Sequence, residues 1–169
     1  KIPIIQYSIK AAIKSKIFDK IHVSTDSLKI KKVVNKSGLD IDFLRPKDLS
    51  GDNIPIIPVV KYVVNRYINE YKKNYTNVFI LSAINPLIDE NDIKKSFSYY
   101  LKIKKPVLGI CEYPAPIQWA FKMDKKSNKL IPINKNYFLK RSQDLKKHFY
   151  DAGAFSIHKI NDLKKTQVG

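Results

Sequence analysis

The sequence predicts an α/β fold, arranged as a three-layer sandwich in which helices cover a largely parallel β-sheet. Short β-branched runs alternate with longer stretches of helical spacing, the pattern of parallel strands joined by helices. The chain has 169 residues, of which 44% are hydrophobic, enough for one sizeable core and too many for global disorder. No internal repeat or Pro/Gly/Ser-rich linker divides it, so we expect a single domain over residues 1–169.

Four segments have helical spacing, and five short runs have strand character. The clearest helix has apolar side chains at i, i+3, i+4, i+7, i+8 and i+11 between Val60 and Tyr71. We expect helices over residues 4–14, 27–38, 55–71 and 89–103. Strands are expected over residues 20–24, 40–44, 77–81, 106–112 and 154–158, with a loop over 46–53.

Local signals mark the ends of two of these helices. Asp26 or Ser27 can cap the second helix, and Gly38 supplies the left-handed stop after it. Asp89, with Asp92 three residues later, is typical of a capped helix start.

The segment that follows Pro114 and Pro116 has the period of a strand. Its apolar residues alternate with others, and a turn over 125–128 leads to a second strand over 130–133. The residues on the apolar face are Ile117, Trp119, Phe121 and Met123. We expect a β-arm over residues 113–140 outside the main sheet, whose exposed apolar face favours a partner.

The net charge of +17 comes from 32 basic and 15 acidic residues. The lysines are spread along the whole chain, which indicates a solvated surface rather than a stripe for nucleic acid. No apolar run reaches the roughly 18 residues that cross a bilayer, so no membrane contact is expected. The single cysteine, Cys111, is interpreted as a small buried hydrophobe and fits a reducing compartment, so we expect a cytoplasmic protein.

Polar residues follow four of the predicted strands, where parallel sheets bind ligands. These strand ends are residues 24–27, 45–46, 82–86 and 112–113. The three histidines lie far apart and are interpreted as structural or surface residues. The sequence has no histidine or cysteine set with metal-ligand spacing and no glycine-rich phosphate-binding motif, so metal ligands are not assigned.

Several strings, in order and spacing, resemble the acylneuraminate cytidylyltransferase family, which makes CMP-activated sialic acids. The resemblance covers nearly the whole chain. The strings are Ile2-Pro3-Ile4-Ile5-Gln6-Tyr7-Ser8-Ile9, Phe18-Asp19-Lys20, Ser24-Thr25-Asp26-Ser27, Phe43-Leu44-Arg45-Pro46, Leu49-Ser50-Gly51-Asp52-Asn53, Glu112-Tyr113-Pro114, Gln118-Trp119-Ala120-Phe121-Lys122 and Arg141-Ser142-Gln143-Asp144-Leu145.

One departure from the family pattern indicates a subfamily. Sialic-acid enzymes carry Arg-Asp-Asn-Gly-Ala after the Arg-Ser-Gln-Asp-Leu string, whereas here the chain reads Tyr150-Asp151-Ala152-Gly153-Ala154. This Asp-Ala-Gly core resembles the pseudaminic acid cytidylyltransferases. Loss of an arginine and an asparagine would leave groups of the wrong sugar unpaired, which costs about 1–3 kcal/mol for each buried group. N-acetylneuraminic or legionaminic acid stays open as the alternative sugar.

The resemblance implies a Rossmann-like nucleotidyltransferase sheet and a homodimer that forms through the β-arm. It implies a reaction in which CTP and a nonulosonic acid give a CMP-sugar and pyrophosphate, with Mg²⁺ as cofactor. By carry-over, Ser24, Asp26, Arg45 and Ser82 are nucleotide-binding residues, and Ser82 takes the place of a family glutamine. Lys122, Arg141 and Gln143 are the catalytic candidates, and Tyr150 and Ala152 mark the position that selects the sugar.

The family also has parts that lie outside these residues. Its glycine-rich nucleotide loop precedes the segment that starts here at Lys1, and some of its magnesium-binding aspartates lie beyond Gly169. We therefore expect the chain to be part of a longer protein. The alternative from another class is an inactive, truncated domain that binds nucleic acid through its positive charge.

Overall fold

The structure is a computed structural model that describes residues 1–164. Its α-helices are α1 (Ile5–Ser15), α2 (Leu28–Asn35), α3 (Ile56–Asn69) and α4 (Glu90–Ile103). Its strands are β1 (Asn77–Leu81), β2 (Val107–Glu112), β3 (Phe121–Asp124), β4 (Lys129–Pro132) and β5 (Phe149–Lys159). Single 3₁₀ turns are η1 (Lys47–Leu49), η2 (Ile117–Trp119), η3 (Lys135–Tyr137), η4 (Ser142–Asp144) and η5 (Ile160–Lys164).

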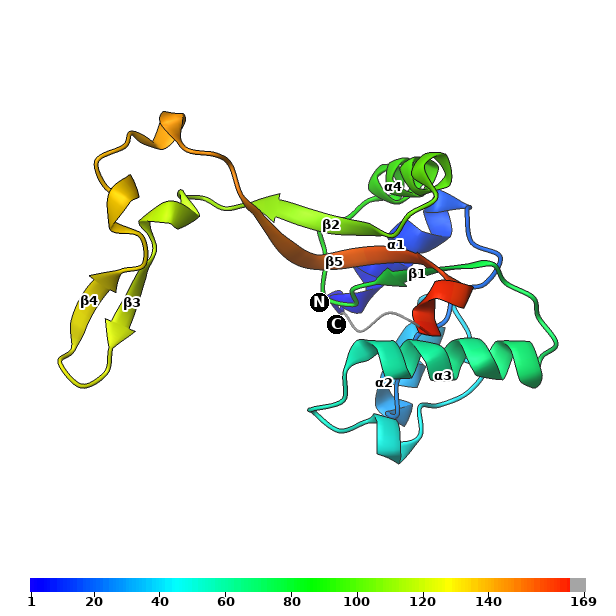
Figure 1. Ribbon diagram of the computed structural model, residues 1–169. Helices are drawn as coiled ribbons and strands as arrows, with labels where there is room; N and C mark the ends of the chain where they lie inside the picture. The colour runs from blue at the N-terminus through cyan, green and yellow to red at the C-terminus, as the bar shows by residue number, and fades with distance from the viewer. Residues whose placement is uncertain (165–169) are drawn as a thin grey trace. The chain divides into compact units, whose positions relative to one another are not determined.

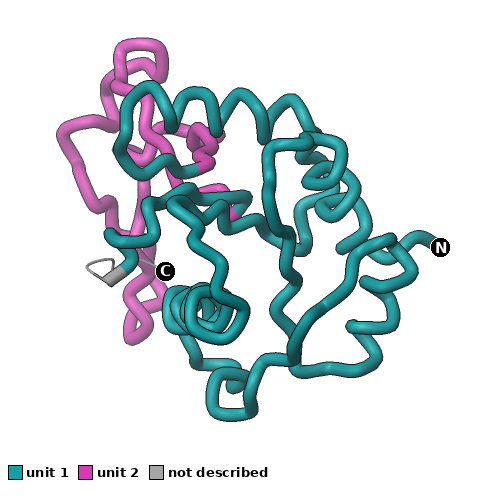
Figure 2. The backbone as a smooth tube through the Cα atoms, turned by 90° about the vertical axis from the view of Figure 1, so that its right-hand side faces the viewer, with its two compact units in different colours: residues 1–108, 154–169 teal, residues 109–153 magenta. Residues whose placement is uncertain are grey.

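The chain divides into two compact units, which are coloured separately in Figure 2. Unit 1 consists of residues 1–108 and the chain from Ala154 onward, and unit 2 consists of residues 109–153. The four α-helices and β1 belong to unit 1. The β3–β4 hairpin, and with it the whole predicted arm over 113–140, belongs to unit 2.

The main sheet has the strand order β1-β5-β2 (Figure 1). β1 and β5 run antiparallel, with Asn77 opposite Lys159 and Leu81 opposite Phe155. The predicted parallel arrangement is therefore wrong for this pair. Apolar runs identify strands, but the direction of a strand in the sheet depends on the connection that precedes it. The chain reaches β5 through unit 2, and β5 runs opposite to β1.

Helices pack against both faces of β1 (Figure 1). Phe79 and Leu81 pack on the cluster that contains Ala11 and Ala12 of α1 and Ile93 of α4. The alternate residues of the strand face the other way. Val78 and Ile80 pack on a second cluster, formed by Ile57, Val64 and Leu163. A strand that is apolar on every residue is thus explained by burial on both faces.

The helix ends follow the predicted local signals. The Ser27 hydroxyl accepts a hydrogen bond from the Ile30 N–H at the start of α2. Gly38, which follows this helix, has φ +83°, a left-handed conformation. Asp89 and Asp92 form a reciprocal capping box at the start of α4. Both predicted caps are confirmed because they depend on residues only a few positions apart.

Two predicted strands, over residues 20–24 and 40–44, are wrong: neither segment is in a strand. The segments nevertheless lie side by side. The Arg45 N–H donates to the Thr25 carbonyl over 2.8 Å, and the rings of His22 and Phe43 stack with centroids 4.5 Å apart. A strand needs a hydrogen-bonded ladder to a neighbour, and a cavity separates residues 20–24 from β1.

In unit 2 the hairpin is shorter than predicted. β3 pairs with β4, with Phe121 opposite Pro132 and Met123 opposite Leu130. Residues 117–119 form the 3₁₀ turn η2 instead of a strand, so the two-residue period holds over β3 alone. Cys111 is exposed, which corrects the prediction that it is buried.

Across residues 1–164, none of the helices combines the length and the apolar character that crossing a bilayer requires.

Candidate functional site

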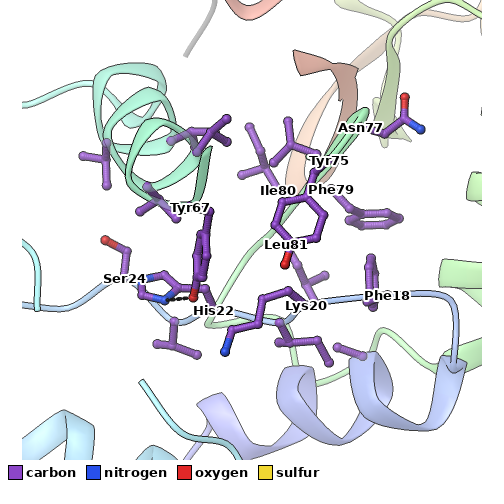
Figure 3. A pocket seen from close by; sticks show the side chains of 18 of the residues that line it. Phe18, Lys20, His22, Ser24, Tyr67, Tyr75, Asn77, Phe79, Ile80 and Leu81 are labelled. Carbon is purple, nitrogen blue, oxygen red and sulfur yellow. Dashed lines mark hydrogen bonds between the residues drawn. The ribbon is translucent and has the colours of Figure 1, made fainter. Parts of the chain in front are cut away.

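A cavity of about 650 Å³ lies in unit 1 (Figure 3). The irregular segment 17–24 lines it on one side, and residues 74–83, which contain β1, line it on another. Side chains of α1 and α3 contribute further to the lining, and most of them are apolar. Three of the predicted nucleotide-binding residues, Ser24, Arg45 and Ser82, belong to the lining.

Ser24 and Arg45 carry buried donors without a partner. The Ser24 Oγ and the Arg45 Nε are shielded from solvent, and neither has a hydrogen-bond partner within residues 1–164. Arg45 is anchored by its backbone, because its N–H donates to the Thr25 carbonyl. The Arg45 Nη2 lies 3.8 Å from the Asp26 Oδ1, which makes a long ion pair. Buried unpaired donors are rare in proteins and suit a ligand that supplies acceptors.

Ser82 sits where β1 ends. Its N–H donates to the Ala154 carbonyl over 2.9 Å, which continues the pairing between β1 and β5 by one residue. Its carbonyl accepts the Ser8 hydroxyl over 2.8 Å, so the first half of α1 is tied to the carboxyl end of β1. We use "the rim" for Ser24, Asp26, Arg45 and Ser82.

A polar network that sequence reasoning did not find lies beside the rim. The Tyr67 hydroxyl donates to the Asp42 Oδ2 over 2.5 Å, and the Lys20 Nζ lies 2.6 Å from the same oxygen. The Tyr67 hydroxyl is also 3.1 Å from the His22 Nδ1. Because Tyr67 gives its only proton to Asp42, the His22 Nδ1–H donates to the Tyr67 oxygen. The His22 Nε2 is then an acceptor, buried and unpaired among the described residues.

The surroundings shift the pKa values of this network. Burial lowers the pKa of His22 to about 4, and the positive charges of Lys20 and Arg66 act in the same direction, against Asp42. Burial alone would raise the pKa of Asp42, but hydrogen bonds from Lys20 and Tyr67 outweigh it and lower that pKa. Burial, followed by the hydrogen bond to Asp42, raises the pKa of Tyr67. At neutral pH the histidine is therefore uncharged beside an ionised Asp42.

The predicted catalytic residues belong to unit 2 and are exposed there. Lys122 lies on β3 opposite Ile131, on the hairpin face that Phe121 and Met123 do not occupy. Arg141 precedes η4 and pairs with Asp144, with 2.9 Å between Nε and Oδ2. Gln143 is the central residue of η4. Arg141 and Gln143 therefore come from one turn, whereas Lys122 comes from the hairpin.

The predicted sugar-selecting residues lie in the first half of β5. The Tyr150 ring packs on Tyr113 with centroids 4.9 Å apart, and Ala152 is half-buried. Asp151 and Gly153 flank Ala152 along the chain. The Asp151 carboxylate accepts a hydrogen bond from the Gly153 N–H over 2.8 Å, and Gly153 has φ +60°. Within β5, the Asp-Ala-Gly core thus combines a side-chain-to-backbone hydrogen bond with a left-handed residue, a conformation that favours glycine.

In the described part of the chain, no three Asp, Glu, His or Cys side chains gather as a metal-binding group. Asp26 is the acidic residue of the rim, and it already faces Arg45. A divalent cation at the rim would need further oxygen ligands from elsewhere.

A family model described as cytidylyltransferase matches residues 1–166. A pseudaminic acid cytidylyltransferase from Campylobacter jejuni strain 81-176 is 33% identical over 154 residues, which cover 90% of this chain and 66% of that protein. A CMP-N,N'-diacetyllegionaminic acid synthase from Legionella pneumophila is 25% identical over 77% of this chain. The chain thus spans just under two thirds of the length of the C. jejuni relative.

A solved structure of CMP:2-keto-3-deoxy-manno-octonic acid synthetase, complexed with CTP, has a similar fold. It superposes with a TM-score of 0.65 at 12% sequence identity. The match covers 96% of this chain and 66% of that one. This similarity shows that the two chains share an α/β fold.

Proposed function

Because this chain belongs to the cytidylyltransferase family, we propose that the protein transfers CMP from CTP to a nonulosonic acid, with pseudaminic acid as the sugar. The similarity to the C. jejuni pseudaminic acid cytidylyltransferase carries the proposal. Relatives that act on other nonulosonic acids match at lower identity or over less of the chain. N-acetylneuraminic and legionaminic acid are therefore the alternative substrates.

The proposed reaction is a single displacement at the α-phosphorus of CTP. The anomeric hydroxyl oxygen of the sugar forms the new bond to phosphorus, while the bond between the α-phosphorus and the bridging oxygen breaks. Pyrophosphate leaves with the bond electrons, and the hydroxyl proton passes to a base or to water. Such a transfer depends on positioning and on charge stabilisation rather than on a covalent enzyme intermediate.

The rim is the proposed nucleotide site. Ser24 and Arg45 offer buried donors to the acceptors of the cytidine end of CTP, and Ser82 lines the same cavity. Asp26 holds the Arg45 guanidinium through their ion pair. Lys122, Arg141 and Gln143 are proposed to contact the sugar or the phosphates, since cationic and amide groups suit developing negative charge.

Mg²⁺ is the proposed cofactor, because a divalent cation can neutralise charge on departing pyrophosphate. The described residues do not make a complete magnesium site by themselves. Asp26 is proposed to offer the ion one oxygen ligand.

Tyr150 and Ala152 are proposed to select the sugar. Both stand in the segment that differs from the sialic-acid pattern, and the Asp151–Gly153 hydrogen bond holds that segment in shape. We further propose that the protein is a homodimer built on the β3–β4 hairpin and that it works in the cytoplasm. The exposed apolar face of the hairpin supports the dimer.

The deciding experiment measures pyrophosphate release by the natural full-length protein. CTP and Mg²⁺ are supplied with pseudaminic, N-acetylneuraminic or legionaminic acid in parallel. Release with pseudaminic acid is expected to exceed release with the other two by at least tenfold, and omission of Mg²⁺ should abolish it. Equal or greater release with another acid would reject the sugar assignment, and no release with any of them would reject the reaction.

A matched pair of variants tests the rim. Arg45→Lys keeps the positive charge but removes the planar set of donors, so we expect the KM for CTP to rise at least tenfold. Arg66→Lys is the control, because Arg66 lies on α3 and pairs with Glu70 outside the rim. Equal KM values for CTP in the two variants would contradict the assignment of Arg45 to the nucleotide site.

A further inference from the structure

The two segments that carry the buried donors of the rim have little backbone support. Residues 20–25 and 40–45 lie in no helix or strand. Within residues 1–164, a single backbone hydrogen bond joins them, from the Arg45 N–H to the Thr25 carbonyl. Both segments also contribute to one apolar cluster, but apolar contacts are not directional. Polar side chains are therefore left to fix how the two segments are oriented.

The Tyr67 hydroxyl links both segments to α3. It donates to the Asp42 Oδ2 over 2.5 Å and accepts the His22 Nδ1–H over 3.1 Å, the contact that is dashed in Figure 3. The Lys20 Nζ reaches the same Asp42 oxygen over 2.6 Å. Tyr67 itself is buried and lies on α3. One hydroxyl group is thus the common point of three parts of the chain.

The aromatic rings beside this hydroxyl bring the network close to the rim. The His22 ring stacks on Phe43, with the centroids 4.5 Å apart. Ser24 follows His22 by two residues, and it carries one of the buried donors. Arg45 follows Phe43 by two residues and carries the other. A shift in the stacked pair would therefore move both donors.

We propose that Tyr67 is a positioning residue: its hydroxyl holds the segments of Ser24 and Arg45 in the geometry that binds CTP. The inference rests on the proposed function, because it takes the rim as the nucleotide site. Tyr67 acts through its partners rather than on the nucleotide, since its only hydroxyl proton is given to Asp42. Donors that are held in place before binding lose less freedom when the ligand arrives, which increases affinity.

A matched pair of variants of the natural full-length protein tests the proposal. Tyr67→Phe keeps the ring beside His22 and Phe43 and removes only the hydroxyl. We expect its KM for CTP to rise at least fivefold while kcat stays within twofold, because binding of the nucleotide is weakened equally in the ground state and the transition state. Tyr62→Phe is the control, since the Tyr62 hydroxyl accepts from Arg66 and contacts neither segment.

The split between KM and kcat separates positioning from a purely structural role. A loss of folded protein would lower kcat at an unchanged KM for CTP. That result for Tyr67→Phe, or an equal rise of KM in Tyr62→Phe, would overturn the proposal.

Asp42 provides a second test with a conservative variant. Asp42→Asn keeps an oxygen that can accept the Tyr67 hydroxyl, whereas Asp42→Ala keeps none. Asp42→Ala should raise the KM for CTP at least fivefold, and Asp42→Asn should show less than half of that rise. Equal KM values for the two variants would contradict positioning through this hydrogen bond.

A measurement without nucleotide keeps the positioning role separate from the proposed function. The resonance of the buried Arg45 Nε–H in ¹⁵N-labelled full-length protein reports the geometry of the rim. Tyr67→Phe should shift or broaden this resonance, and Tyr62→Phe should leave it unchanged. Absence of pyrophosphate release by the natural protein would reject the proposed function, whereas an unchanged Arg45 resonance in Tyr67→Phe would overturn the positioning role.

Discussion

The hydrogen-bond network of His22 is visible in the structure but has no signature in the sequence. As a lone histidine in a short apolar run it had no pattern that pointed to a network. The partners Tyr67 and Asp42 come from positions 45 and 20 residues away, and the fold brings them together. Ser24 and Arg45 are different, because the family strings single them out directly.

His22 makes stability depend on pH. Its pKa of about 4 in the folded protein lies below its ordinary value of 6.5, so the unfolded chain binds more protons between these values. The free energy of unfolding should therefore fall as the pH drops from 7 towards 4, by on the order of 3 kcal/mol from His22. The lowered pKa of His158 acts in the same direction. Asp42 has a lowered pKa in the folded protein, so its protonation reduces the free energy of unfolding only below its ordinary pKa of 3.8.

Urea unfolding between pH 7 and 4.5 measures this slope. His22→Phe, which keeps a ring against Phe43, should flatten most of it. His148→Phe replaces an exposed histidine and should leave the slope as it is. Parallel slopes for the natural protein and His22→Phe would contradict the prediction.

At the scale of elements, local sequence signals define the helix starts and stops. The capping box of α4 needs only Asp89 and Asp92, which are three residues apart. By contrast, the segments 20–24 and 40–44 have strand-like sequences but no ladder, because a strand depends on a neighbour far along the chain. The 3₁₀ turn at 117–119 interrupted an otherwise regular alternation after Pro116.

Removal of the α4 cap should lower thermal stability. Asp89→Ala leaves the N–H groups of Asn91 and Asp92 without their acceptor, so we expect the Tm to fall by about 3 °C. Asp89→Ser retains a capping oxygen and should lose less than half as much. Calorimetry of the three proteins makes the comparison, and equal Tm values for Ala and Ser would contradict a capping role.

Gly153 should resist substitution because of its backbone conformation. Its φ of +60° is strained for any residue with a side chain, although a Cβ there would meet no neighbour. Gly153→Ala should therefore cost about 1–2 kcal/mol of folding free energy. Gly51→Ala is the matched control, since φ is not positive there and the nearest atom is at an ordinary 3.7 Å. Equal unfolding free energies for the two variants would refute this explanation.

At the scale of the whole molecule, the β3–β4 hairpin carries an uncovered apolar face. Phe121, Met123 and Leu130 share this face and are 47–60% exposed. A face of this kind favours association, which is the basis of the proposed homodimer. The alternation in the sequence located this face, although its extent was shorter than predicted.

Met123→Asp combined with Leu130→Asp should weaken that dimer. Charges on the apolar face would be desolvated without partners, so we expect the dissociation constant of the full-length protein to rise at least tenfold. Lys129→Gln, on the other face of the hairpin, should leave association unchanged. Sedimentation equilibrium distinguishes these cases, and an unchanged dissociation constant for the double variant would argue against the hairpin as the dimer contact.

The sequence by itself determined the α/β class, the helices, the caps and the family, because each of these depends on periodicity or on short strings of neighbouring residues. Only the tertiary structure decided the antiparallel entry of β5, the His22–Tyr67–Asp42 network and the cavity beside β1. Strand direction, ladder formation and burial depend on which distant segments meet. In unit 1 the predicted strand over residues 20–24 lines the cavity and has no hydrogen-bonded ladder.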